Sequence, residues 1–302
     1  MSTISAFEKE IRMQLNFVQN FVPQRPLSTL KQKRAVFCGT GDSFVSAQLA
    51  EVFSGFRTRA FDPLDLLKNK RLVKNHDLYL ISISGNTISN IKLAKAAKNT
   101  VAVTANPQSR LGKSCKRTIP LRYQNSGIFT AGSISFLASA LTCISLVSKI
   151  KIRNVSKLYK RAKNQSQRVR LGSKVFLLGN LYTFPIAMFG AAKLYEVPGI
   201  DAHYERIEQF AHMGLFSAKK GDTVIIFEEK NNHNAQLARH LRKYGMHVVQ
   251  IQPNSKNILE KILFFTFVSE FIALNQAKKK NQKECFFVKA KKLRSVSSSM
   301  IY

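Results

Sequence analysis

Cysteine is scarce in this chain, and its four copies are widely scattered. They stand at positions 38, 115, 143 and 285 and form no CxxC pair. Zinc sites and short disulfide frameworks both require closely spaced cysteines, so this spacing favours neither. We therefore expect buried or incidental thiols in a reducing compartment, and no metal site.

Long apolar runs are also missing. No window approaches the length of a membrane span, and the N-terminus carries acids and an amphipathic pattern instead of a basic segment followed by an apolar one. We expect a soluble, cytoplasmic protein that does not contact membranes. With 302 residues, 45% of them hydrophobic, the chain is long enough for two domains of ordinary size.

Acidic residues are few: 17 Asp and Glu stand against 48 Lys and Arg, which gives a net charge of +31. Such a charge attracts any anion. The basic residues are nevertheless spread along the chain, and no zinc-finger, RRM or helix-turn-helix pattern accompanies them. The densest cluster runs from Lys278 to Arg294. This distribution favours a solvated surface, so we expect nucleic acid to bind, if at all, without specificity.

Short apolar runs alternate with helical patterns, which predicts an α/β protein with parallel strands and right-handed crossovers. Expected strands lie at 35–38, 77–82, 100–104 and 119–121, and again at 175–179, 223–227 and 247–251. Matching segments of the two halves are offset by about 140 to 145 residues, as in an internal repeat. We expect two tandem domains, each a parallel sheet with helices on both faces.

The expected boundaries follow from this pattern. A lead-in helix occupies residues 1–33, the first domain residues 34–150, and a basic linker helix residues 151–173. The second domain, with a basic tail, covers residues 174–302.

A hydroxyl-rich segment, Ser82-Ile-Ser-Gly-Asn-Thr87, stands where a buried strand gives way to a helix. Open α/β sheets bind ligands at this position, where the helix offers unpaired amide donors and the positive end of its dipole. Ser82, Ser84 and Thr87 can donate to phosphate oxygens, and Gly85 allows a close approach of the backbone. Simple helix capping explains one hydroxyl. Three hydroxyls with a glycine favour anion binding.

A second segment, Gly39-Thr-Gly-Asp-Ser43, has the same placement one strand earlier. It lacks the third glycine of a dinucleotide fingerprint and the Gly-Lys-Ser/Thr of a P-loop, which argues against NAD and ATP. Thr40, Gly41 and Ser43 are candidate ligand contacts, although Ser43 also suits a helix cap.

These two segments, followed by Thr104-Ala-Asn-Pro-Gln-Ser109, resemble a sugar isomerase (SIS) domain. The second half resembles the isomerase part of glucosamine-6-phosphate synthase. The matching residues are Phe184-Pro-Ile-Ala187, Gly190-Ala191 and Lys193-Leu-Tyr-Glu196, and His212 follows Glu196 by sixteen residues, as in that family.

The resemblance implies that Glu196 moves a proton between C1 and C2 of an open-chain sugar, while His212 opens the ring. Lys193, three residues before Glu196, would keep the carboxylate ionised or stabilise enediolate charge. The alternatives are a surface Lys–Glu pair and a structural histidine, with Glu205 and Glu208 as other carboxylates. Gln209 stands where many relatives have Glu.

The chain also departs from the family. Ile83 replaces a glutamine of the phosphate loop, and Asn86 replaces a glutamate. Arg294 stands where the synthase has a lysine that reaches the sugar; an arginine forms no Schiff base but can clamp a phosphate. The 302 residues contain no segment that resembles the glutaminase domain of the synthase, so we expect that glutamine alone is not a substrate.

The sequence thus predicts an isomerase or an ammonia-dependent deaminase acting on a hexose or hexosamine 6-phosphate, working as a homodimer without metal or organic cofactor. The alternative is a non-catalytic phosphosugar sensor with a basic partner-binding surface.

Overall fold

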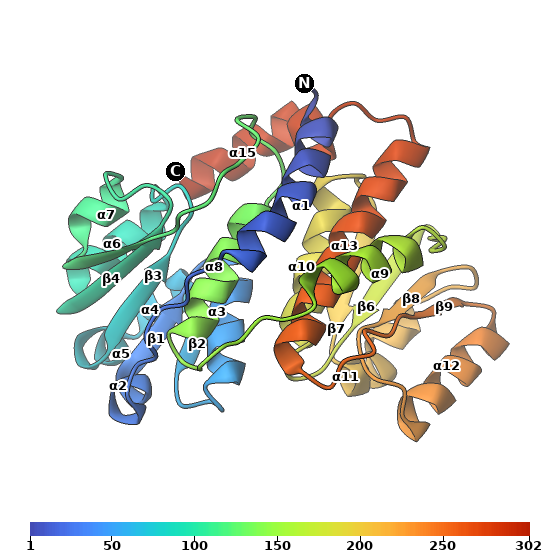
Figure 1. Ribbon diagram of the computed structural model, residues 1–302, viewed down its shortest axis with the longest axis horizontal. Helices are drawn as coiled ribbons and strands as arrows, with labels where there is room; N and C mark the ends of the chain where they lie inside the picture. The colour runs from blue at the N-terminus through green and yellow to red at the C-terminus, as the bar shows by residue number, and fades with distance from the viewer. The chain divides into compact units, whose positions relative to one another are not determined.

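Two parallel β-sheets, each with helices packed against it, organise the computed structural model, which describes residues 1–302 (Figure 1). The chain clusters into two compact units, one around each sheet. The first-sheet unit comprises Asn16–Asn125, Gly132–Lys151 and Lys291–Tyr302. The second-sheet unit comprises Met1–Leu15, Ser126–Ala131 and Ile152–Ala290.

The first sheet has the strand order β2-β1-β3-β4-β5, with every neighbouring pair parallel. Its strands are β1 Ala35–Cys38, β2 Arg59–Phe61, β3 Asp77–Ile81, β4 Asn99–Thr104 and β5 Arg117–Pro120. Alternate side chains of each strand point to opposite faces. Phe37 and Tyr79 therefore enter one apolar core, whereas Val36 and Leu78 enter the other.

Helices cover both faces of this sheet. Helices α3 (Asp42–Phe53) and α8 (Ile134–Ser145) pack together over one face. The other face is covered by a layer of four short helices whose apolar residues share one core. They are α4 Pro63–Lys68, α5 Lys70–Asn75, α6 Ile88–Ala96 and α7 Arg110–Ser114. The unit also contains α2 Thr29–Arg34 and the terminal helix α15 Lys291–Ile301.

The second sheet has the order β7-β6-β8-β9, also parallel throughout. Its strands are β6 Lys174–Leu178, β7 Asp201–Glu205, β8 Thr223–Ile226 and β9 His247–Gln250. This order repeats that of the first sheet without a counterpart of β5. The internal repeat seen in the sequence therefore corresponds to a repeated strand order.

In the second-sheet unit the long helix α13 packs against α9 and α10, whereas α11 and α12 share an apolar core with β6 and β8. The long helices are α9 Val155–Ser166, α10 Phe184–Glu196, α12 Asn232–Tyr244 and α13 Ile258–Lys279; the short ones are α11 Ile207–His212, η1 Gly214–Ser217 and α14 Phe286–Lys289. Helix α1 (Thr3–Gln19) begins in this unit, where the Gln14 side-chain amide donates to the buried Glu270 of α13 at 2.7 Å. No helix combines the length and apolarity needed to cross a membrane.

The predicted α/β class and the parallel strands are confirmed, and β1 forms with the expected bounds. Among the elements that were not predicted are the strands β2 and β7 and the long helix α13. Of the cysteines, Cys38, Cys143 and Cys285 are buried, whereas Cys115 is partly exposed.

Candidate functional site

Two loops meet at one edge of the first sheet. β1 and β3 are neighbours, with Cys38 opposite Leu80, so the loops 39–43 and 82–87 leave the sheet side by side at its carboxyl edge. Helices α3 and α6 begin at these loops. Each helix start offers backbone N–H groups and partial positive charge to the same region.

The loop 82–87 is held by its own hydroxyl groups. Ser82 and Thr87 are buried, and their side-chain oxygens lie 3.0 Å apart. The Gly85 amide donates to Ser82 Oγ at 3.1 Å. Thr87 is the N-cap residue of α6 but makes no side-chain capping bond, so its hydroxyl does not satisfy the amides of the first turn. Those amides are donors of the kind that bind an anion.

Gly85 has a backbone conformation and a close packing contact that favour glycine at this position. Its φ is +69°, and a Cβ atom there would lie 1.9 Å from Ser109 Oγ. The Gly85 carbonyl accepts from the Leu111 amide at 2.9 Å, and Thr104 Oγ1 donates to the Ile83 carbonyl at 3.1 Å. The segment from Thr104 to Ser109 thus packs against the loop 82–87 and helps to fix its conformation. The sequence marks this segment only as part of the family resemblance and does not indicate this contact.

The loop 39–43 makes a tight turn into α3. A Cβ atom on Gly39 would lie 2.7 Å from Ser43 Cβ, and Gly41 adopts φ +55°. Ser43 is buried, and its hydroxyl forms no hydrogen bond within the chain, while Thr40 is half-buried. These side chains leave a hydroxyl donor available next to the loop 82–87.

The second sheet repeats this pair of loops with different chemistry. Gly179 and Leu181 repeat the turn of Gly39 and Gly41, including a positive φ of +43° at Leu181. After β8, however, Glu228 accepts from the Asn180 amide at 3.0 Å and from the Thr183 hydroxyl. A cavity of about 160 Å³ at this edge is lined by Glu228, Glu229 and Lys261, among others.

A carboxylate therefore occupies, in the second sheet, the place where the first sheet presents hydroxyls. Like charge disfavours a phosphate there. Applying an offset of about 145 residues to residues 82–85 gives Phe227-Glu-Glu-Lys230, so this difference can be recognised in the sequence.

Lys193 and Glu196 lie together near the end of α10. Lys193 Nζ is 2.5 Å from Glu196 Oε2, with the lysine side chain fully buried and the glutamate side chain 37% exposed. The ammonium also lies 4.9 Å from the centroid of the Phe189 ring. This is not a solvated surface pair: a buried cation neutralises a carboxylate that reaches solvent.

His212 is not near Glu196 within the unit. As a crossover helix, α10 runs antiparallel to β6 and β7, so Glu196 at its end lies at the edge where the strands begin. His212 ends α11, which follows β7, and Gly214, two residues later, lies against the side chain of Glu205 at the end of β7, so His212 lies near the opposite edge. The five residues of β7 separate the two edges by roughly 13 Å.

The remaining candidates are dispersed. His212 Nε2 lies 3.3 Å from Glu208 Oε1, and both side chains are exposed. Burial raises the pKa of Glu205, with His203 acting in the opposite direction. Arg294 is exposed on α15 in the first-sheet unit, whereas Glu196 belongs to the second-sheet unit.

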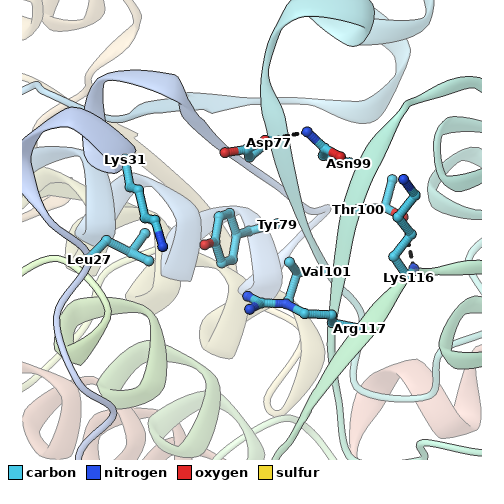
Figure 2. Close-up of a pocket in the computed structure, with 9 residues that line it drawn as sticks. All are labelled: Leu27, Lys31, Asp77, Tyr79, Asn99, Thr100, Val101, Lys116 and Arg117. Atoms are coloured by element: carbon cyan, nitrogen blue, oxygen red, sulfur yellow. Dashed lines mark hydrogen bonds between the residues drawn. The ribbon is translucent and has the colours of Figure 1, made fainter.

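A further cavity of about 220 Å³ lies at the amino edge of β3, β4 and β5 (Figure 2). In Figure 2 the Lys31 ammonium and the Arg117 guanidinium point toward the Tyr79 hydroxyl. Burial raises the pKa of Tyr79, while Arg117 acts in the opposite direction. No sequence motif marks this cavity, and it lies at the opposite edge of the sheet from the two loops.

Comparison with known proteins gives matches in structure alone. No protein-family model and no curated protein sequence matches the chain. Glucosamine-6-phosphate deaminase from Thermotoga maritima is similar over 93% of this chain and 95% of its own, with a TM-score of 0.71 and 18% identity. The C-terminal domain of glucosamine-fructose-6-phosphate aminotransferase from Francisella tularensis is similar over 94% and 97%, with a TM-score of 0.70 and 14% identity.

The chain has the fold of the phosphosugar isomerases. Tagatose-6-phosphate ketose/aldose isomerase from Escherichia coli shares it over 92% of this chain and 91% of its own, with a TM-score of 0.66 and 17% identity. The resemblance predicted from the sequence motifs is thus confirmed at the level of the fold.

Proposed function

We propose that the protein is a sugar-phosphate isomerase, or a related deaminase, acting on a hexose or hexosamine 6-phosphate. In this proposal residues 34–150 and 174–302 supply the sheets of two tandem sugar isomerase domains, with residues 126–131 and 291–302 each belonging to the compact unit of the other range. The observation that carries the proposal is the difference between the two loop pairs: hydroxyls, Gly85 and two helix starts at the first sheet, against the carboxylate of Glu228 at the second. One phosphate site per chain follows from that difference.

The hydroxyls of Ser43, Ser82, Ser84 and Thr87 and the first amides of α6 would hold the phosphate. Gly85 allows the backbone to approach it, and Thr40, Gly41 and Asn86 would complete the contacts. Asn86 is neutral where the family has a glutamate, so it adds no repulsion toward the phosphate.

Glu196 would act as the base. Aldose–ketose interconversion moves one proton between C1 and C2 through a cis-enediol, which requires a carboxylate that takes up and returns that proton. The buried Lys193 ammonium, 2.5 Å from Glu196, favours the ionised carboxylate and would stabilise developing enediolate charge. The partial exposure of the Glu196 side chain leaves it accessible to a substrate.

His212 would open the sugar ring. Because Glu196 and His212 lie at opposite edges of the second sheet, one substrate meets both only if they come from two copies of the chain. This favours a homodimer in which each active site uses Glu196 of one subunit and His212 of the other. Arg294 would clamp an oxygen or phosphate of the sugar.

The proposal is tested by incubating the purified protein with fructose 6-phosphate, and separately with glucosamine 6-phosphate, in deuterated water. We expect deuterium at C2, and ammonia release where the amino sugar is the substrate. Glu196→Gln is expected to lower exchange on the order of 10³-fold, as for loss of a positioned base. Glu229 is an exposed carboxylate, so Glu229→Gln is the matched control. We expect this variant to keep full exchange.

Binding of either sugar phosphate without exchange identifies the chain as a phosphosugar sensor. Absence of binding contradicts both the enzyme and the sensor.

A further inference from the structure

The helical layer of the first-sheet unit carries charge of almost one sign. Helices α4, α5, α6 and α7 cover one face of the sheet through a shared apolar core, and α6 contacts the other three. Nine exposed basic residues lie on or directly after these helices. They are Lys68, Lys70, Arg71, Lys74, Lys92, Lys95, Lys98, Arg110 and Lys113.

Acidic residues do not balance the positive charge of this layer. Asp65 is its exposed carboxylate, and Asp62 is half-buried, where its side chain caps α4. None of the nine basic residues forms an ion pair. A surface that serves solubility normally mixes both signs, whereas a contiguous field of one sign concentrates counter-ions and polyanions.

We propose that this basic layer, formed by α4 to α7, binds the phosphate backbone of duplex nucleic acid. The proposal is independent of the sugar-phosphate activity, because it rests on the outer face of the helices and not on the loops 39–43 and 82–87.

The residue types of this layer favour one class of anionic partner over the others. Helices α4 to α7 contain no aromatic residue, so they offer no platform on which unpaired bases stack. Membrane-surface helices insert large apolar side chains, but Leu64 is the one large apolar residue exposed on these four helices. Lysine and arginine tips without apolar or aromatic partners suit contacts to backbone phosphates, which carry no sequence information.

Helices packed side by side lie about 8–10 Å apart, so the layer extends over roughly 20 Å, comparable to the width of a nucleic-acid duplex. Up to nine cations can therefore face phosphates. The binding constant is expected to fall with salt with a logarithmic slope of about −0.9 for each phosphate neutralised.

The experiment measures binding of a 20-base-pair DNA duplex of arbitrary sequence by fluorescence anisotropy between 50 and 300 mM salt. The test variant carries Lys92→Gln, Lys95→Gln and Lys98→Gln on and directly after the central helix α6. The matched control carries Lys157→Gln, Lys160→Gln and Lys163→Gln on α9, which removes the same charge from the second-sheet unit. Thermal midpoints verify that both variants fold.

We expect the α6 variant to lose on the order of 100-fold in affinity at 0.1 M salt, with a slope reduced by about 2.7, and the α9 variant to lose less than about threefold. Equal losses in both variants would mean that net charge alone drives binding, which overturns the proposal. So would salt-independent binding, no binding, or a preference for phosphatidylserine vesicles over the duplex.

Discussion

At the scale of single residues, the conformation of the loop 82–87 depends on Gly85. Its φ of +69° is strained for any other residue, and an added Cβ would collide with Ser109 Oγ at 1.9 Å. We expect Gly85→Ala to destabilise the fold by about 1–3 kcal/mol and to abolish sugar-phosphate binding.

The control for this change is Gly55→Ala. Gly55 has a similar φ of +63°, but a Cβ there would meet only the tip of Arg57 at 3.8 Å. It is expected to cost about 1 kcal/mol and to leave ligand binding intact. Chemical denaturation and calorimetric titration with fructose 6-phosphate measure both variants. Normal binding by Gly85→Ala would show that the loop does not hold the ligand.

Some features of single residues were predictable from the sequence and others were not. A buried strand, a glycine and a helix start in that order predict a tight loop containing Ser82, Gly85 and Thr87, which the structure has; that this loop binds an anion stays a prediction. The burial of Lys193 was not predictable, since a Lys–Glu pair at helical spacing is usually solvated, and only the packing of α10 shows the ammonium to be enclosed. The close packing of Ser109 against Gly85 was likewise not predictable, because the two residues are 24 positions apart in the sequence.

At the scale of elements, the two missed strands, β2 and β7, are sheet-edge strands without an apolar run. β1 reads Ala-Val-Phe-Cys and is buried throughout, whereas the sheet-edge strand β7 reads Asp-Ala-His-Tyr-Glu and has one buried residue, Ala202. An edge strand is paired on one side and needs no apolar run. The helix α13 was missed because its residues are buried almost all round, which removes the period of an amphipathic helix.

In the loops that follow β6 and β8, two neighbouring glutamates are expected to differ in their effect on stability. Glu228 accepts from the Asn180 amide and the buried Thr183 hydroxyl, so Glu228→Ala is expected to cost about 1–2 kcal/mol of unfolding free energy. Its neighbour Glu229 is 59% exposed and pairs with Lys261, so Glu229→Ala should change stability by less than about 0.5 kcal/mol. Urea denaturation measures both, and equal effects would contradict the anchoring role of Glu228.

A hydrogen-bonded contact at the start of α1 is expected to depend on pH. Thr3 donates to Glu284 through its hydroxyl at 2.6 Å and its amide at 3.2 Å, and these two hydrogen bonds lower the pKa of Glu284 from its ordinary value of 4.5. Because the folded pKa lies below the unfolded one, this contact stabilises the fold above pH 4.5 and is lost as the pH falls through the lower folded value.

Hydrogen exchange of the Cys285 amide, which donates to Thr3 Oγ1 at 2.7 Å, reports this contact. We expect its protection to decrease more on acidification below pH 4.5 than that of amides in β8. Glu284→Gln should abolish that extra pH dependence. Unchanged protection of Cys285 down to about pH 3 would be inconsistent with the assigned contact.

At the scale of the whole molecule, the proposed division of the active site between two copies is testable by mixing variants. Glu196→Gln and His212→Ala should each be inactive alone. Random reassociation makes half of the dimers mixed, and each mixed dimer has one site with both residues intact. Recovered exchange activity should therefore approach about one quarter of the wild-type value.

Refolding the two variants together from denaturant, then assaying exchange at C2, measures this recovery. Refolding each variant separately is the control. No recovery, with mixed dimers demonstrated by differential labelling, would argue against a shared site.

In the proposed function one bound sugar phosphate contacts both the loop 82–87 and Glu196. A crystal structure of the Glu196→Gln variant with fructose 6-phosphate tests this arrangement. We expect phosphate oxygens within about 3 Å of the hydroxyls of Ser84 and Thr87, and C2 within about 3.5 Å of the side chain at position 196 of the same or the partner chain. A sugar phosphate bound elsewhere, or one whose C2 lies far from position 196 in both subunits, would contradict it.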